Sequence, residues 1–176
     1  MAASTSSEQD KSHLTEFKWS PSLVSFLLKE SLSPYESIYD QIAVGAIVFN
    51  ASGDRVLLMQ RTSSGTFPKH WEIPGGMCTL DDENVLSATS LELLESTGLR
   101  VKYARKHVGD ESFAIEPANT VCRHNFVVDV ERKEPGETDV KINTLKYRSS
   151  CWASKEESQG QEADWFRARV HFGGSA

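Results

Sequence analysis

The segment Trp71–Val101 constrains the fold of this chain more than any other part, because it joins four local signals in a fixed order. It reads WEIPGGMCTLDDENVLSATSLELLESTGLRV: a short β-rich stretch, two adjacent glycines, an acidic loop and a long helical pattern. The spacing predicts a helix over Asp82–Thr97, with Asp81 or Asp82 as N-cap and acidic residues where the helix dipole favours them. Gly98 stands where a left-handed C-cap would end that helix.

The flanking sequence predicts strands on both sides of this segment. Ile42–Phe49 and Arg55–Arg61 are short apolar runs separated by a turn, and we expect them to pair as a β-hairpin. Further strands are expected over Arg100–Val108, Asn119–Val130 and Val140–Leu145. Strands and helices are mixed without regular alternation, which favours an α+β fold or an α/β/α sandwich with a mixed sheet.

Composition bounds the class of protein. A chain of 176 residues suits one domain, and we expect residues 1–15 to be a disordered tail and residues 16–170 to form a single domain. The net charge of −6 argues against non-specific binding to nucleic acid or to a membrane surface. The longest apolar run, Ile42–Phe49, is too short to span a bilayer, so we expect a cytoplasmic protein. The sequence does not predict an oligomeric state.

Glu92 and Glu95 are the candidate metal ligands. They are three residues apart on the expected helix, so their carboxylates share one face. The expected turn at Gly75 and Gly76 lets the backbone come close to a ligand and leaves carbonyl oxygens available to a cation. Mg²⁺ prefers oxygen ligands of this kind. Taken alone, the two glutamates are better explained as part of a solvated acidic helix face than as a metal site.

The whole segment resembles the signature of the Nudix family. That signature is a Gly, five residues, a Glu, seven residues, then Arg-Glu, an aliphatic residue, any residue, Glu-Glu, any residue, Gly and an aliphatic residue. Counting back from Gly98, the glutamates of the signature match Glu83, Glu92 and Glu95, and Gly76 matches its first glycine with one extra residue. The resemblance implies a Nudix-like α/β/α sandwich with a mixed β-sheet.

The resemblance also implies a reaction, the hydrolysis of a diphosphate linked to another moiety with Mg²⁺ or Mn²⁺. Glu92 and Glu95 would then be catalytic residues and metal ligands, together with the carbonyl of Gly76. The small-molecule substrate would contact Arg61, Glu72 and Phe67, the first through a phosphate group.

The chain departs from the signature at positions tied to that chemistry. Leu91 stands where the family has Arg, and Ser96 stands where it has the second Glu of the pair. Family members often add a carboxylate from a later loop, expected here around Lys146 and Tyr147, where this chain has no acid. Glu134, Glu137 and Asp139 are possible substitutes. With fewer ligands, we expect Mg²⁺ to bind weakly in the absence of substrate.

Two other functions remain compatible with the sequence. One is an enzyme that kept the fold and performs non-hydrolytic acid–base chemistry on an apolar metabolite, such as isomerisation, cyclisation or hydration. His107 and His124, in strand-like segments, are candidates for such chemistry, although a structural role suits them better. The other is a noncatalytic binding module.

Overall fold

A computed structural model describes residues 16–27, 38–117, 119–132 and 139–158 of the chain. The expected tail over residues 1–15 and the part of the expected domain beyond residue 158 lie outside these ranges, as do Glu134 and Glu137. No helix among the described residues is long and apolar enough to cross a membrane.

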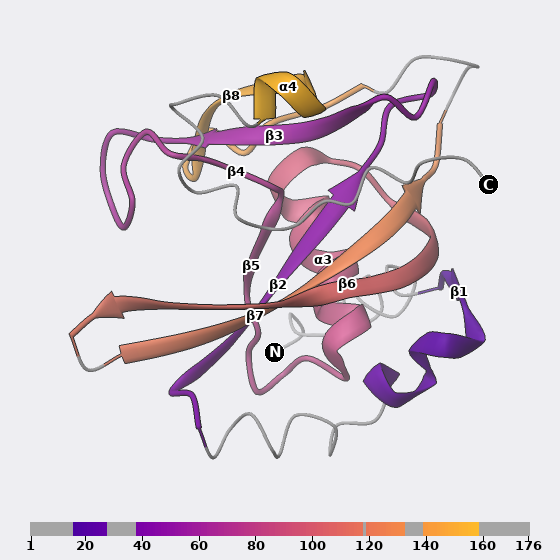
Figure 1. The fold of residues 1–176 in the computed structure, drawn as a ribbon, viewed down its shortest axis with the longest axis horizontal. Coiled ribbons are helices and arrows are strands. Elements are labelled where there is room, and N and C mark those ends of the chain that lie inside the picture. The colour runs from indigo at the N-terminus through magenta and orange to yellow at the C-terminus, as the bar shows by residue number, and fades with distance from the viewer. Residues whose placement is uncertain (1–15, 28–37, 118, 133–138, 159–176) are drawn as a thin grey trace, which may run out of the picture.

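Two β-sheets form the body of the described structure (Figure 1). The larger sheet has the strand order β1-β6-β7-β2-β5 and is mixed, because β1 and β6, and β7 and β2, pair in parallel while the other neighbours are antiparallel. Its strands are β1 (Lys18–Trp19), β2 (Gln41–Val48), β5 (Gly75–Met77), β6 (Val101–Glu116) and β7 (Asn119–Val130). The smaller sheet has the antiparallel order β4-β3-β8. Its strands are β3 (Arg55–Arg61), β4 (Trp71–Glu72) and β8 (Tyr147–Ser154).

Three helical elements among the described residues accompany the sheets. The longest, α3 (Val85–Thr97), lies behind the larger sheet in Figure 1. The 3₁₀ helix η1 (Pro21–Leu27) packs near one end of β6, and α4 (Lys155–Ser158) follows β8. The fold is therefore an α/β sandwich with a mixed sheet, as the sequence predicts.

The central helix begins three residues later than predicted. Asn84, rather than Asp81 or Asp82, is its N-cap, and the Asn84 side chain accepts a hydrogen bond from the Ser87 amide at 2.9 Å. The predicted C-cap is confirmed, because Gly98 adopts a left-handed conformation with φ of 71°.

Three predictions about strands are wrong. β2 and β3 belong to different sheets and meet only at an isolated bridge between Phe49 and Val56. Gly75 and Gly76 form β5 beside β2 rather than a turn. Val140–Leu145 is irregular chain and turn instead of a strand. β2 instead pairs in parallel with β7 along its full length, so a strand distant in sequence replaces the expected hairpin partner.

The main core lies between α3 and the two sheets. Its buried side chains include Leu86 and Leu93 from α3, Val44 from β2, Leu57 from β3 and Phe126 from β7. The leucines of α3 thus face the core, and the glutamates of α3 lie near its edge.

Candidate active site

Glu92 lies against the backbone of Gly76. A β-carbon at Gly76 would overlap the Glu92 carboxylate, so only glycine allows this close approach. The contact joins the middle of α3 to β5, and it brings together two of the residues that the sequence selects. Gly76 reaches this position from a strand, opposite Val44 of β2, rather than from a turn.

Lys146 places its ammonium between the two candidate metal ligands. Its Nζ is 3.2 Å from Oε2 of Glu92 and 3.6 Å from Oε2 of Glu95. The Glu92 side chain is only 16% exposed, whereas those of Glu95 and Lys146 are 51% and 40% exposed. Burial raises the pKa of Glu92, and the charge and hydrogen bond of Lys146 act in the opposite direction.

Backbone hydrogen bonds tie the loop that carries Lys146 to the end of α3. The Lys141 amide donates to the carbonyl of Thr97 at 2.8 Å, and the Asn143 amide donates to the carbonyl of Ser96 at 3.0 Å. The Lys146 amide in turn donates to the Asn143 carbonyl at 3.0 Å. The last carbonyls of a helix need partners outside it, so this loop satisfies them and fixes Lys146 beside the helix.

Ser96, the residue after Glu95, is completely buried, and its hydroxyl has no hydrogen-bond partner among the described residues. Tyr147, the first residue of β8, is buried near it. The Tyr147 hydroxyl donates to Oε1 of Glu72 at 3.2 Å and, at 3.4 Å, to the carbonyl of Gly75. Burial raises the pKa of Tyr147, so the phenol remains a neutral donor.

Glu72 is the centre of a second charged group. Arg61 donates to Oε1 of Glu72 at 2.9 Å, and Nη1 of Arg123 lies 3.8 Å from Oε2. Arg61 thus has a protein carboxylate as its partner in this structure, where the sequence predicts a phosphate contact. The grouping of Arg61, Glu72, Arg123 and Tyr147 unites β3, β4, β7 and β8 at one place.

A small pocket of about 40 Å³ opens beside Glu72. Aromatic and charged side chains line it: Phe67, His70, Trp71, Glu72, Glu111, Phe113 and Arg123. The rings of Phe67 and Phe113 meet edge to face, with centroids 5.9 Å apart. Phe67 and Lys69 both adopt positive φ angles, of 53° and 64°. Such backbone strain is frequent at functional loops.

The remaining candidates are arranged less closely. Glu83 is exposed immediately before the N-cap of α3, and Leu91 is half-buried. Asp139 is exposed and lies 3.9 Å from Lys141. No ion pair among the described residues joins Glu83 to a cation.

The residues around Glu92 fit a divalent cation. Two carboxylates already share one positive charge, and the backbone of Gly76 is in contact with one of them. Oxygen donors on a fixed helix face suit Mg²⁺ or Mn²⁺, although two carboxylates make a sparse ligand set. The resemblance to known enzymes implies such a metal, and Glu92 and Glu95 are the residues that would hold it.

Sequence reasoning missed three members of the site: Lys146, Tyr147 and Arg123. The first two had a signal, since the motif alignment places the family's additional carboxylate at this loop. Lys146 at this place has the charge opposite to the expected carboxylate, and Glu92 and Glu95 on α3 are its partners. Arg123 lies in a strand whose pairing with β2 the sequence did not predict.

Comparisons with known proteins agree with this geometry. A family model described as NUDIX domain matches residues 40–170. The m7GpppN-mRNA hydrolase NUDT17 of Danio rerio is 40% identical over 70 residues, which make up 39% of this chain and 23% of that protein. The chain therefore matches less than a quarter of the length of that relative.

Solved structures show the same fold. The MutT protein of Methanosarcina mazei Go1 superposes with a TM-score of 0.55 at 27% identity, over 70% of this chain and 83% of that one. An Ap4A hydrolase from C. elegans superposes with a TM-score of 0.54 at 16% identity, over 70% and 86% of the two chains, and shows likeness of fold alone. Since the family model covers most of the sequence and the motif residues meet in space, the chain belongs to the NUDIX domain family.

Proposed function

We propose that the protein hydrolyses a diphosphate linked to another moiety, a nucleoside diphosphate derivative or an organic diphosphate, with the help of Mg²⁺ or Mn²⁺. The observation that carries the proposal is the convergence of Glu92 and Glu95 on one cation beside Gly76. In this protein the cation is the ammonium of Lys146. A group of two acids that already holds one positive charge is suited to a metal–diphosphate complex.

Each residue has a distinct part in the proposed reaction. Glu92 and Glu95 would hold the divalent ion, which when bound supplies charge neutralisation at the diphosphate and activation of water. When the ion binds, the ammonium of Lys146 would leave Glu92 and Glu95 and become available to contact a phosphate oxygen. Tyr147, kept neutral by burial, holds the Gly75 carbonyl and Glu72, so β4 and β5 keep their positions around the site.

The aromatic pocket supports a nucleoside as one part of the substrate. Phe67, Trp71 and Phe113 offer ring surfaces to a planar base, and Glu111 and Arg123 offer an acceptor and a donor at its edge. One relative is named as an m7GpppN-mRNA hydrolase. That name describes a phosphate chain between nucleosides, which fits a pocket beside a carboxylate cluster.

The second candidate is a repurposed enzyme, one that kept the fold and lost the metal-dependent hydrolysis, and the position of Lys146 favours it. Lys146 lies between the predicted metal ligands, and Ser96 and Leu91 remove two groups that the family's metal chemistry uses. A permanent Lys146 ion pair would leave the fold without a metal and available for acid–base chemistry on a different metabolite, or for binding alone.

The test is phosphate or nucleotide release from a panel of diphosphates with Mg²⁺ or Mn²⁺, against controls in EDTA. The panel includes nucleoside diphosphate derivatives, dinucleoside polyphosphates and a methylated cap dinucleotide. Glu92→Gln and Glu95→Gln should each lower kcat/KM at least about ten-fold, as loss of a metal ligand does. Glu83→Gln is the matched control, because Glu83 is exposed outside the cluster. No metal-dependent release from any substrate would favour the repurposed enzyme.

A further inference from the structure

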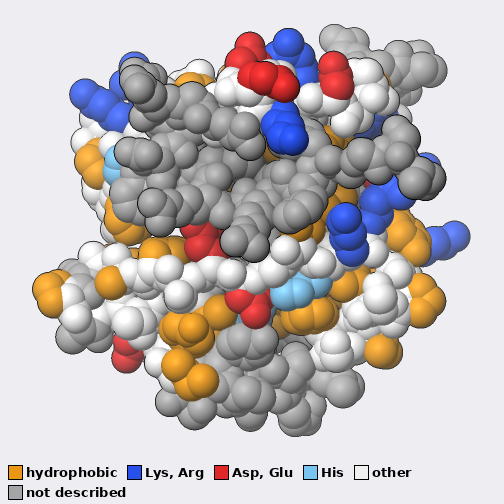
Figure 2. Space-filling view, viewed as in Figure 1, with side chains coloured by type: hydrophobic (Ala, Val, Ile, Leu, Met, Phe, Trp, Pro, Cys, Tyr) orange, Lys and Arg blue, Asp and Glu red, His pale blue; other side chains and the backbone are white. Residues whose placement is uncertain are grey.

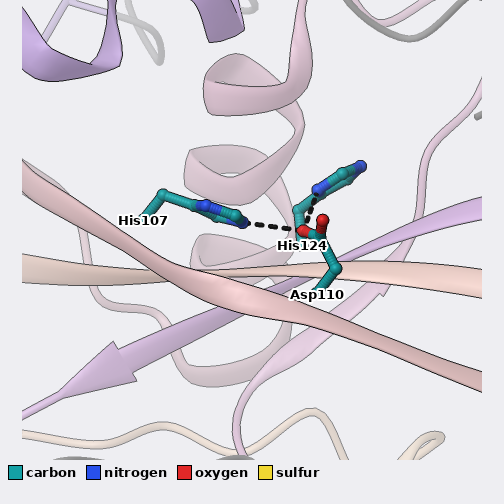
Figure 3. A group of neighbouring side chains, drawn as sticks. All are labelled: His107, Asp110 and His124. Atoms are coloured by element: carbon teal, nitrogen blue, oxygen red, sulfur yellow. Dashed lines mark hydrogen bonds and ion pairs between the residues drawn. The ribbon is translucent and has the colours of Figure 1, made fainter. Parts of the chain in front are cut away.

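A second group of possible metal ligands lies on β6 and β7, on the sheet face opposite the aromatic pocket: His107, Asp110 and His124 (Figure 3). His107 and Asp110 belong to β6, and Asp110 pairs with His124 across the β6–β7 ladder. Residues three apart in a regular strand point to opposite faces. His107 and Asp110 share one face because the register shifts between His107 and Gly109, and Gly109 adopts a φ of 128°. This bulge is the local device that assembles the group.

Both imidazoles contact the same carboxylate oxygen. Nε2 of His107 lies 2.8 Å from Oδ1 of Asp110, and Nδ1 of His124 lies 2.6 Å from it. All three ligand atoms fall within 4.8 Å of one another. In a tetrahedral zinc site with bonds of about 2.0 Å, ligand atoms are about 3.3 Å apart. An ion can therefore enter this group once each His–Asp contact widens by less than about 1 Å and the two imidazole nitrogens, which lie within 4.8 Å of each other, adopt the same separation.

The group is both fixed and reachable. The side chain of His124 is completely buried, and the rings of Phe26 and Phe126 pack against His107 with centroids 4.7 Å and 5.2 Å away. Phe26, on η1, also lies 5.9 Å from the ring of His124. The side chains of His107 and Asp110 are 23% and 34% exposed, so an ion would enter from their side. In Figure 2, histidine and acidic side chains lie next to each other at the surface among hydrophobic ones.

Strand alternation separates this group from Glu72 and the aromatic pocket. Arg123, which precedes His124, turns towards Glu72 and Glu111 beside the aromatic pocket. His124 therefore lies on the opposite face of β7, where Phe126 joins the core under α3. The group also differs in chemistry from Glu92 and Glu95. Two imidazoles and one carboxylate favour a transition metal ion, whereas oxygen ligands alone favour Mg²⁺.

We propose that His107, Asp110 and His124 form a second metal site, which binds a divalent transition metal ion such as Zn²⁺. The ion takes three protein ligands and keeps one position for water, and it links the bulge of β6 to β7. A site of this kind stabilises the strand pair on which η1 packs, and it works independently of Mg²⁺ at Glu92 and Glu95.

Calorimetry with ZnCl₂ tests the proposal on the full-length, tag-free, metal-free protein. We expect one zinc ion to bind to this group, and His107→Gln and Asp110→Asn each to weaken that binding at least about ten-fold. His70→Gln is the matched control, since His70 lines the pocket on the other face, and it should bind zinc as the wild type does. A Glu92→Gln/Glu95→Gln variant should retain the same zinc affinity, and excess Mg²⁺ should not displace the ion.

Thermal unfolding provides a second readout and a check of folding. Zinc should raise the melting temperature of the wild type and of His70→Gln but not that of His107→Gln or Asp110→Asn, whose circular dichroism spectra should be native. Equal zinc affinity in folded His107→Gln, Asp110→Asn and wild-type protein would overturn the proposal. Loss of zinc binding only in the Glu92/Glu95 variant would also overturn it, because the ion would then occupy the carboxylate site.

Discussion

Lys146 determines the electrostatic state of the candidate active site at the scale of single residues. Its ammonium balances Glu92, whose carboxylate is otherwise disfavoured by burial, and it contacts Glu95 nearer the surface. A divalent ion has to displace this charge before it can use both carboxylates. The weak Mg²⁺ binding expected from the sparse ligand set thus has a second physical cause, competition with a lysine.

Lys146→Met should strengthen Mg²⁺ binding to the free protein. The substitution removes the competing charge and keeps an unbranched side chain, so the two carboxylates face the metal without a counter-ion. Because Lys146 is 40% exposed, solvent screens the pair, and we expect a gain on the order of ten-fold, or about 1.4 kcal/mol. Calorimetry with MgCl₂ measures it.

The matched control is Lys141→Met. Lys141 lies on the same loop but pairs with exposed Asp139 at 3.9 Å, so its loss should leave Mg²⁺ affinity unchanged. An equal gain in Mg²⁺ affinity in both variants would mean that the change in net charge, and not the loss of the Lys146 ion pair, causes it. If the protein is a diphosphate hydrolase in which Lys146 contacts phosphate, Lys146→Met should also raise KM despite its tighter metal binding.

Ser96→Glu tests the position at which the family carries its second glutamate. Ser96 is completely buried beside Tyr147, and an uncompensated buried charge costs about 3–5 kcal/mol. We therefore expect a lower melting temperature in EDTA and a larger rise on adding Mg²⁺ than the wild type shows. Ser96→Gln, similar in size without the charge, should lack the additional rise. Equal stabilisation of the two variants by Mg²⁺ would place the metal away from residue 96.

The sequence was sufficient to predict contacts between residues of the segment Trp71–Val101. It was insufficient to predict the contacts that this segment makes with residues elsewhere in the chain. Helical spacing puts Glu92 and Glu95 on one face, the resemblance implies that they share a metal site with Gly76, and the structure has the contact between Glu92 and Gly76. Lys146 and Arg123 come from a loop and a strand that are distant in sequence. Their positions depend on hydrogen bonds to the end of α3 and on the pairing of β7 with β2, which single-chain patterns do not encode.

At the scale of elements, α3 shows how one capping residue sets a boundary. The acidic run before the helix offers several N-cap candidates, and the structure uses Asn84. Asp82 instead accepts hydrogen bonds from the backbone and hydroxyl of Thr79, at 2.6 Å and 3.1 Å, and closes the preceding turn. Propensity alone ranks Asn and Asp equally as caps, which explains why the helix itself was predictable and its first residue was not.

Asn84→Ala should lower the free energy of unfolding by about 1 kcal/mol, because the Ser87 amide loses its acceptor at a buried helix end. Asn84→Asp keeps an acceptor and should cost much less. Urea denaturation of both variants measures the difference. Asp82→Ala is the comparison at the cap that the sequence suggested, and a larger loss there than at Asn84 would contradict the observed helix start.

At the scale of the whole molecule, the mixed α/β class was predictable and the connection of the sheets was not. The runs Ile42–Phe49 and Arg55–Arg61 have the length and spacing of a hairpin, and local pairing is the usual outcome. Here the chain crosses from one sheet to the other at Phe49, and β2 is buried between β7 and β5. A continuous apolar run such as β2 is typical of a strand covered on both faces. This pattern predicts a central strand, whereas the turn that follows it predicts a hairpin with β3.

Two thiols, that of buried Cys122 and that of half-buried Cys78, predict how the stability of the whole molecule depends on alkaline pH. Burial raises the pKa of Cys122 to about 11 and that of Cys78 to about 12, above the value of about 8.5 expected in an unfolded chain. The folded state therefore retains protons that the unfolded state releases. Their contribution to stability is fully present below about pH 8.5 and is lost as pH rises towards the folded values, by up to about 1.4 kcal/mol per pH unit for each thiol.

Urea unfolding between pH 8.5 and about 10.5, with reductant present, should show this loss directly. Cys122→Ala should be less stable at neutral pH, because it leaves a small cavity in β7, but its stability should fall less steeply with pH. Cys151→Ala is the comparison: partial burial also raises the pKa of this exposed thiol, without the large shift of Cys122, so its loss should change the slope less than the loss of Cys122 does. Parallel slopes for the wild type and Cys122→Ala would show that Cys122 ionises alike in both states, which would contradict its position in the interior between β6 and β2.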